Sequence, residues 1–410
     1  MPVDTVKPHV LIVGAGLAGL TLAQCLRKQQ EVSFEVFDSD DDLITRHGYA
    51  IGVHSITDDM VSAFPSDMPS LRESADHLQP LKLEPQIKFY GREGPVVAVQ
   101  NTPDTPCLRL NRLLFRKWLA TRIPIQFGKR LDSVEEGRNG VTIHFKDGTS
   151  ASGDILVGAD GVNSKVREHM LGQPNSEVLN PIQFACVWGE TTLSGEAMER
   201  QLSLGHSAYG VTSKNFDYVL FVGLNKVNED FSADYYWYIA WEDEGVDKED
   251  HWLQHATKAT KLDHVLYKTE SSDPSLREIL LLTPAEGIVS GSPVFRDAII
   301  PSLPSTGRVT MVGDAVHPMT PFRGEGGMHA IRDALNLGKV IETLRRTFPD
   351  GSQHALDSYH TEILQRGNQA VILSRNALKH NQENGNVVTA WGSLATPARE
   401  EKIKLDHYKP

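Results

Sequence analysis

The chain has 410 residues, enough for two domains or for one domain with a large insertion. Its residues are 40% hydrophobic and 23% charged, an ordinary globular composition, and the formal net charge of −12 argues against nucleic acid or an anionic membrane surface as the main partner. Three widely spaced cysteines form neither a disulfide framework nor a metal-ligand pattern, so we expect no metal site and a reducing, cytoplasmic compartment. No apolar run is long enough to predict a membrane span.

The first predicted unit is a strand, a glycine-rich loop, a helix and a second strand. Residues 9–13 form a short apolar run, the loop GAGLAGL follows, and residues 17–28 carry apolar side chains at helical spacing. A second apolar run over residues 34–37 ends at Asp38. This order indicates a β-α-β unit.

The loop of this unit has the spacing G-x-G-x-x-G at Gly14, Gly16 and Gly19. Side chains at these positions would keep the backbone away from a pyrophosphate, and the following helix start offers unpaired N–H donors to phosphate oxygens. The Asp38 carboxylate can accept from both ribose hydroxyls and would repel a 2′-phosphate. The pattern therefore predicts NAD or FAD rather than NADP, and its alternative is a tight structural turn.

The middle of the chain reads differently. Strand signals rich in aromatic residues dominate from about residue 181 to residue 294, which predicts a mostly antiparallel sheet. The remaining expectations are an irregular or weakly helical stretch over 65–85, a helix over 109–123, a hairpin turning at 147–148, a strand over 308–314, a helix over 327–346, a helical region over 352–385 and a loosely packed tail over the last 25 residues.

These elements predict an α/β fold in which a β-rich domain interrupts a nucleotide-binding domain. We expect the Rossmann-like domain to be discontinuous, at residues 1–180 and 285–350. The inserted sheet occupies residues 181–284 with parts of 50–105, and C-terminal helices and the tail occupy 351–410.

Two later stretches repeat the strand-loop-helix order. Residues 154–168 place Asp160 and Gly161 after a strand, and taken alone they read as an ordinary strand-to-helix turn. Residues 307–336 place Asp314 after a strand, followed by a proline-rich bend and by Gly326 and Gly327 at a helix start. That loop either presents N–H groups to an anionic ligand or packs closely against a neighbour.

Together the three stretches resemble the flavoprotein monooxygenases related to para-hydroxybenzoate hydroxylase, over nearly the whole chain. GAGLAGL with Asp38 resembles the family's dinucleotide fingerprint, GADGVNSKVR its D-G motif and GDAVHPMTPFRGEGG its G-D motif. RLNRLLFRKWL resembles the helix whose arginine reaches the flavin, here Arg112, and RHGYAIGVH resembles the segment beside the isoalloxazine ring. Two local departures are Met328, where the family often has asparagine, and the charged pair Arg323 and Glu325 within the late loop.

The resemblance implies a glutathione-reductase-like FAD-binding domain, with the late glycines beneath the pyrimidine end of the flavin. It implies that NADPH or NADH binds transiently and reduces FAD, that O2 adds at the flavin C4a position, and that the resulting hydroperoxide passes one oxygen to the substrate. The residues it implies at the FAD are Gly14, Gly16, Leu17, Ala18, Gly19, Asp38, Arg46, Gly48, Arg112, Asp160, Gly161, Asp314, Pro321, Gly324, Gly326, Gly327 and Met328.

The same resemblance implies a small organic substrate, aromatic or polycyclic as in secondary metabolism, held between the flavin and the inserted sheet. No catalytic side chain is legible, but His54, Arg323 and Tyr236 are candidates for positions near the flavin ring. His317 is interpreted as structural. Aromatic residues that either line the substrate pocket or pack within the sheet are Trp188, Tyr236, Trp237, Tyr238 and Trp241.

Several alternatives stay open, including a Baeyer–Villiger oxygenation on the same fold, and a monomer or a homodimer. A flavin halogenase would need a W-x-W-x-I-P segment, which YYWYIAWED echoes without the proline. An oxidase of the amino-acid-oxidase type usually lacks the stretch at Asp160 and Gly161. An NAD-dependent dehydrogenase leaves the late glycine loop unused, and a non-enzymatic scaffold would not need that loop at all.

Overall fold

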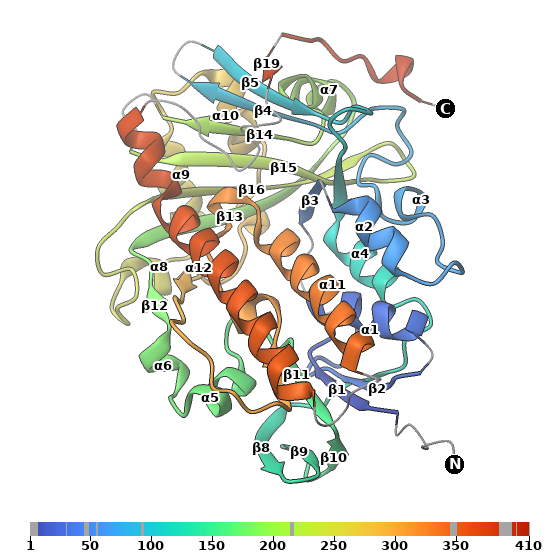
Figure 1. Cartoon of the computed structure of the whole chain (residues 1–410). Coiled ribbons are helices and arrows are strands. Elements are labelled where there is room, and N and C mark those ends of the chain that lie inside the picture. Colours follow the sequence, from blue (N-terminus) through green and yellow to red (C-terminus); the bar gives the residue numbers. More distant parts are fainter. Residues whose placement is uncertain are drawn as a thin grey trace.

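The computed structural model describes residues 7–29, 31–44, 49–54, 56–91, 94–213, 217–344, 351–384, 396–398 and 400–409. A parallel sheet with flanking helices occupies one end of the molecule and a broad, mostly antiparallel sheet occupies the other (Figure 1). Helices α11 (Gly326–Leu344) and α12 (Ser352–Asn384) pack against each other between these two ends (Figure 1).

The parallel sheet confirms the predicted β-α-β unit. Helix α1 (Leu17–Gln29) connects the adjacent parallel strands β1 and β2, and α11 packs along α1. The β1 residues 10–13 are buried, as expected for a parallel strand that is covered on both faces. The strands, in sheet order, are β18 (Val309–Met311), β11 (Ile155–Gly158), β1 (His9–Val13), β2 (Ser33–Phe37) and β7 (Ile125–Gln126).

The helix predicted over 109–123 is shorter than expected. Residues Cys107–Asn111 form strand β6, which pairs antiparallel with β3 (Ala50–His54), and helix α4 spans only Arg112–Leu119. The change of structure occurs at Asn111, whose side-chain oxygen accepts a hydrogen bond from the backbone N–H of Leu114 at 3.0 Å and so caps the helix. Strand β3 contacts both α11 and β15 (Val219–Val227) of the large sheet, so this ribbon lies between the two halves of the fold.

The large sheet has seven strands and is antiparallel except where β14 pairs with β4. One face packs against helices that the strand-dominated sequence did not predict, mainly α7 (Gly195–Leu204), α9 (Lys258–Lys268) and α10 (Pro274–Leu281). In sheet order the strands are β13 (Phe184–Leu193), β16 (Ala233–Glu242), β15 (Val219–Val227), β14 (Ala208–Thr212), β4 (Gln86–Gly91), β5 (Gly94–Gln100) and β19 (Thr396–Pro397).

Smaller elements complete the described chain. The hairpin expected at residues 147–148 is present between β9 and β10, with Gly148 in the left-handed region at φ 84°. The remaining elements are β8 (Leu131–Gly137), β9 (Gly140–Phe145), β10 (Ser150–Gly153), β12 (Asn180–Pro181), β17 (Arg296–Asp297), α2 (Thr57–Ala63), α3 (Leu71–Ala75), α5 (Lys165–Leu171), α6 (Asn175–Val178), α8 (Trp252–His255), η1 (Ala285–Gly287), η2 (Gly313–Ala315), η3 (Pro321–Arg323) and η5 (Leu405–His407).

The tail is better packed than its sequence indicates. Strand β19 extends the large sheet beyond β5, and the side chains of Ile403 and Leu405 are buried in the cluster beneath that sheet. The backbone N–H of Ile403 donates to Ser203 Oγ at 2.9 Å, and that of Leu405 donates to a carboxylate oxygen of Glu199 at 2.9 Å. The described end of the chain therefore belongs to the β-rich half.

Two large buried clusters divide the molecule. One lies around the parallel sheet with α1, α4, α11 and α12, and the other lies between the large sheet and helices α7, α9 and α10. This arrangement supports the domain boundaries given above, and we propose them with one change: the end of the tail joins the β-rich domain.

Candidate functional site

The first glycine loop combines tight packing with an open side. Gly14 has φ 112°, and a Cβ on it would lie 2.1 Å from the carbonyl oxygen of Ala159; a Cβ on Gly19 would lie 1.9 Å from the carbonyl oxygen of Gly14. Only glycine fits at these two positions. A Cβ on Gly16 would meet nothing within 4 Å. The loop is therefore locked against β11 while its middle glycine faces open space at the start of α1.

Asp38 follows β2 and its carboxylate binds the backbone of the first glycine loop. Its Oδ2 accepts the backbone N–H of Ala15 at 2.6 Å and Nη2 of Arg116 at 3.1 Å, and its Oδ1 accepts the N–H of Asp40 at 2.9 Å. Arg116 also donates from Nε to the carbonyl oxygen of Ala15 at 2.8 Å. The Asp38 residue is only 5% exposed. Arg116 was not among the predicted site residues, although it stands between the apolar residues of a helix, where a charge needs a partner.

The late glycine stretch returns to the first loop. A Cβ on Gly327 would lie 3.5 Å from Leu17 Cδ1 and 3.8 Å from Ile51 Cδ1, and a Cβ on Gly313 would lie 3.3 Å from Ala18 Cβ. Gly326 and Gly327 begin α11, as the sequence predicted. Two helix N-termini that are far apart in the sequence, those of α1 and α11, thus lie beside one another.

Asp314 occupies the space next to these helix starts. The residue is open to solvent. The protein packed around it nevertheless removes enough water to raise the pKa of its carboxyl group. The positive charges of His317, Arg112 and Arg167 oppose that rise. Arg112 begins α4, donates its backbone N–H to the carbonyl oxygen of Tyr49 at 2.9 Å, and places its guanidinium 5.2 Å from the centre of the Tyr49 ring.

A buried charge network fixes the backbone beside Asp314. Oδ2 of Asp333 accepts the N–H of Gly313 at 2.7 Å and lies 2.7 Å from Nε2 of His317, while Oδ1 accepts from Arg366 at 2.5 Å. Burial lowers the pKa of His317, but attraction to Asp333 outweighs it and raises the pKa above its usual value. Burial, together with the charges of His317 and Arg366, lowers the pKa of His329 to about 4. The structural interpretation of His317 agrees with these contacts.

The D-G loop is held by its own acid. Asp160 accepts from Ser164 Oγ at 2.5 Å and from the backbone N–H of Lys165 at 2.7 Å, so it caps the start of α5. Burial raises the pKa of the Asp160 carboxyl. The fully buried Arg167 then reaches across to the carbonyl oxygens of Asp314 and Ala315, at 3.2 and 3.0 Å. This connection between the second and third loops was not predicted from the sequence.

The three candidates near the flavin ring have different environments. Arg323 makes a two-pronged ion pair with Glu325, at 2.7 and 3.2 Å. Burial lowers the pKa of His54, and the charge of Glu325 opposes this. The late loop lies near β3, because a Cβ on Gly327 would be 3.8 Å from Ile51 Cδ1. The buried Tyr236 hydroxyl accepts from Nη2 of Arg109 at 2.7 Å and donates to the Ala50 carbonyl at 3.2 Å.

The other predicted cofactor residues lie along the same loops. Gly161 has φ 79° and, like Gly16, open space where a Cβ would be. Pro321 begins η3 and Gly324 ends it at φ 67°, while Met328 is half-buried in the first turn of α11. Arg46 and Gly48 lie outside the described residues.

Strand alternation separates the five aromatic candidates of the large sheet. Trp237 and Trp241 belong to the cluster under the helices, and Trp237 Nε1 donates to Thr283 Oγ1 at 2.9 Å, so the pocket reading is wrong for both. Trp188, Tyr236 and Tyr238 lie on the opposite face. That face also receives Phe322 of η3, whose ring centre is 5.5 Å from those of Phe184 and of Phe295.

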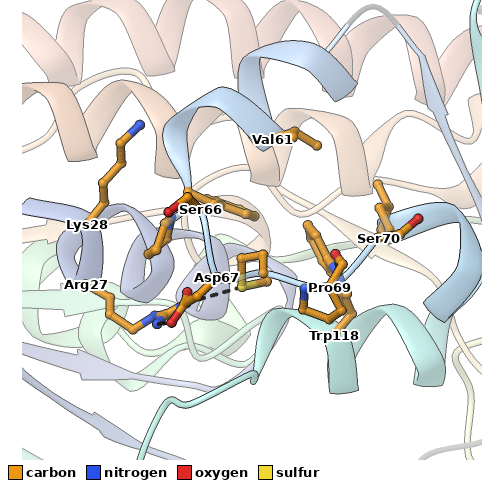
Figure 2. Close-up of a pocket in the computed structure, with 12 residues that line it drawn as sticks. Arg27, Lys28, Val61, Ser66, Asp67, Pro69, Ser70 and Trp118 are labelled. Carbon is orange, nitrogen blue, oxygen red and sulfur yellow. Dashed lines mark hydrogen bonds and ion pairs between the residues drawn. The ribbon is translucent and has the colours of Figure 1, made fainter.

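A surface pocket of about 890 Å³ lies elsewhere, between the end of α1, α2 and the loop that follows α2 (Figure 2). Its lining includes Arg27, Lys28, Asp67 and Trp118, and none of the predicted site residues. Arg27 donates from Nη1 and Nη2 to the two carboxylate oxygens of Asp67, at 3.0 and 2.8 Å (Figure 2), and Lys28 donates to the Ser62 carbonyl. The cations of this pocket already have partners.

In the described part of the chain, no helix is both long and apolar enough to cross a bilayer, and no cluster of three or more His, Cys, Asp or Glu side chains is placed to hold a metal ion. The parallel sheet, the open glycine loop and the late loop beside it define a Rossmann-like dinucleotide-binding protein. Family profiles agree: an NAD(P)-binding Rossmann-like domain matches residues 12–50, and an FAD binding domain matches residues 302–374.

Relatives extend this likeness to most of the chain. The chain is 45% identical over 374 residues to the FAD-dependent monooxygenase thnD of Trichoderma harzianum, covering 90% of this chain and 92% of that protein. It is 28% identical over 370 residues to the FAD-dependent monooxygenase cctM of Talaromyces islandicus, covering 89% and 91%. The protein therefore belongs to the FAD-dependent monooxygenase family and is an oxidoreductase.

Solved structures show the same fold at low sequence identity. The 2,6-dihydroxypyridine-3-hydroxylase of Arthrobacter nicotinovorans is 18% identical, with a TM-score of 0.71 and coverage of 97% of this chain and 99% of that chain. HpxO of Klebsiella pneumoniae, solved in complex with FAD and uric acid, is 18% identical, with a TM-score of 0.70 and coverage of 94% and 95%.

Proposed function

We propose that this monooxygenase uses NADPH or NADH and O2 to insert one oxygen atom into an aromatic or polycyclic organic substrate, with the second oxygen atom leaving as water. The observation that carries the proposal is the meeting of the two glycine loops at Leu17 and Gly327, beside Asp314 and Arg112. One elongated dinucleotide can contact both loops at once. A dehydrogenase would leave the late loop without a ligand.

The open backbone at Gly16 and the start of α1 fit the pyrophosphate of FAD. Three hydrogen bonds already occupy the Asp38 carboxylate, which has about four acceptor positions. We therefore propose that Asp38 accepts from one ribose hydroxyl rather than from both. Asp314, which is open to solvent at the junction of the loops, is proposed to accept from the ribityl or ribose hydroxyls.

At the other end of the cofactor we assign Gly326 and Gly327, with Met328, to the pyrimidine edge of the flavin. The N–H groups and dipole of the α11 N-terminus would stabilise negative charge there by about 1–2 kcal/mol. Arg112, whose charge acts on the Asp314 carboxyl group, would add a positive charge. Arg46, Gly48, Pro321 and Gly324 are proposed to line the same cofactor.

When bound, FAD would accept a hydride from the nicotinamide and activate O2 at its C4a position. The protein's share is to hold the substrate, exclude water and stabilise charge. We propose that the D-G loop, at Asp160 and Gly161, helps to receive the nicotinamide cosubstrate, since a Cβ on Gly161 would meet only open space. Tyr238 and Trp188, whose ring centres are 4.8 Å apart, are proposed to form part of the substrate wall.

The test starts with the purified protein, which should be yellow and should release FAD on denaturation. NADPH and NADH oxidation is then followed with a panel of aromatic and polycyclic compounds under ¹⁸O₂, and products are examined by mass spectrometry. A product carrying one ¹⁸O atom supports the proposal, and its structure distinguishes hydroxylation from epoxidation or ring expansion. A protein that cannot be loaded with FAD, or that incorporates only oxygen from water, contradicts it.

A further inference from the structure

Arg109 is a buried cation whose described partners are all neutral. The residue is 4% exposed, and its Nη2 donates to the carbonyl of Ala50 at 3.1 Å and to the hydroxyl of Tyr236 at 2.7 Å. Within the described chain, no carboxylate forms an ion pair with it, and its buried Nε has no hydrogen-bond acceptor. By contrast, the buried Arg116 pairs with Asp38.

Burying the Arg109 guanidinium without an anionic partner destabilises the folded protein. A buried guanidinium without an anion loses hydration that two neutral oxygens replace only in part. Tyr236 does not supply the anion, because burial raises the pKa of its hydroxyl and keeps the proton in place, despite the opposing charge of Arg109. The missing negative charge is therefore expected from outside the chain.

The surroundings of Arg109 indicate what kind of anion this is. Its guanidinium lies 5.6 Å from the centre of the Phe221 ring, and Phe221 stacks on Tyr238 with centres 5.5 Å apart and planes 20° apart. On the other side, Tyr236 lies 6.3 Å from Tyr49, the ring that Arg112 covers. Arg109 thus stands between an aromatic surface of the large sheet and the residue we assign to the flavin.

We propose that Arg109 is a substrate-binding residue that holds an ionised oxygen, carboxylate or phenolate, carried on a planar aromatic ring. Tyr236 is a positioning residue, because its hydroxyl fixes the guanidinium against β3. The inference rests on the proposed function in taking this face as the substrate wall. Beyond that function, the inference specifies that the substrate is negatively charged and that Arg109 binds this charge.

Binding of matched probes to the FAD-loaded protein tests the proposal. The probes are 2-naphthoate, its neutral counterpart 2-naphthamide, and 2-naphthol, measured by calorimetry and by the change in flavin absorbance. We expect 2-naphthoate to bind wild-type protein more tightly than 2-naphthamide if a carboxylate is the preferred anion. If a phenolate is preferred, 2-naphthol will instead bind more tightly than the amide, increasingly so as the pH rises through its own ionisation.

Three variants separate charge recognition from folding. Arg109→Met should weaken the preferred anion by about tenfold or more and leave 2-naphthamide within about twofold, because only the charged contact is lost. Tyr236→Phe keeps the charge and should retain anion binding within about threefold. Arg200→Met removes an exposed arginine of α7 and should change nothing. Melting curves and flavin content establish that each variant is folded and loaded.

Wild-type protein that binds neither anion more tightly than the amide would overturn the assignment. So would an Arg109→Met protein that keeps its anion affinity, or one that loses acid and amide equally. Failure of the proposed function looks different: the FAD-loaded protein then transfers no oxygen to any compound, while calorimetry still reports whether Arg109 selects anions.

Discussion

His317 Nε2 lies 2.7 Å from Asp333 Oδ2, and both side chains are buried. The same oxygen accepts the N–H of Gly313, so a single carboxylate on α11 holds the loop that carries Asp314. The position of the proposed cofactor acid thus depends on a residue one helix away.

Replacing Asp333 with asparagine should weaken the contacts that hold the loop carrying Asp314. His317 and Arg366 would lose their shared anion, and breaking a buried pair of this kind costs about 3–5 kcal/mol. We expect a fall of that order in the free energy of unfolding of the apoprotein, measured by urea denaturation, together with weaker FAD retention. Glu362→Gln, which removes a half-exposed partner of Arg366, should cost no more than about 1 kcal/mol. Equal losses in both variants would contradict the role given to Asp333.

The His317–Asp333 pair also predicts a pH dependence. The folded-state pKa of His317 is raised, so its contribution is complete below its unfolded pKa of about 6.5 and is lost as the pH rises through the folded value. Although burial opposes it, the positive charge of His317 lowers the pKa of Asp333, whose contribution is complete above about pH 4 and is lost as the pH falls through the folded value. The stability difference between wild type and His317→Gln should be largest between about pH 4 and 6.5 and should shrink as the pH rises above that range. The free energies of unfolding of the two proteins are measured across this range. A difference between them that does not change with pH would contradict the role given to the pair.

Two glycines of the first loop should respond differently to alanine. Gly14→Ala would force a Cβ against the Ala159 carbonyl at φ 112° and should destabilise the apoprotein by at least about 2 kcal/mol. Gly16→Ala meets no protein atom, so it should leave the melting temperature of the apoprotein nearly unchanged while weakening FAD binding. Thermal melts and fluorescence titration with FAD measure the two effects. If Gly16→Ala bound FAD as tightly as wild type, the result would contradict the placement of the pyrophosphate at this loop.

Asp314→Ala should strip FAD from the protein or weaken its binding severely. Asp314 is open to solvent next to Gly313, which approaches Ala18 at the start of α1, and no hydrogen bond of its side chain to the described residues would be lost. Flavin content after gel filtration reports the change, with Asp406→Ala, at an exposed position of η5, as the matched control. Tight flavin retention in Asp314→Ala would refute the assignment.

Asp160→Ala tests the D-G loop. We expect slower flavin reduction by NAD(P)H with a smaller effect on FAD binding, measured by anaerobic stopped-flow absorbance. Loss of its bonds to Ser164 and Lys165 should also cost about 0.5–2 kcal/mol of stability. Asp160→Asn keeps one acceptor and serves as the milder comparison. Unchanged reduction in both variants would leave the loop with a capping role alone.

The nucleotide-binding half could be predicted because its signals are local. The unit from residue 9 to Asp38 contains a strand, glycines and a helix whose roles depend on near neighbours, and the structure reproduces it. Helix α11 was similarly legible from its apolar stripe. The helix at 109–123 was predicted to begin too early because Leu110, which precedes the apolar residues of α4, instead belongs to a strand that pairs with β3.

The residues that hold the site together were not legible. Arg116 contacts Asp38 across 78 positions, and Arg167 contacts the Asp314 carbonyl across 147, so the sequence does not show which partner either cation takes. Asp333 did leave one, since a carboxylate within the apolar stripe of a helix requires a buried partner. Alternation could have divided Tyr236 from Trp237, but only the packed helices decide which face of the sheet meets the cofactor half.

Phe322 belongs to the late glycine loop, yet its ring rests on Phe184 and Phe295 beneath the large sheet. The two halves of the molecule are consequently not interchangeable modules. A chimera that imports residues 181–284 from a relative would leave Phe322 facing a foreign surface, and the displaced ring would shift η3 together with the start of α11. Recombination aimed at a new product range should therefore exchange Pro321–Arg323 along with the sheet.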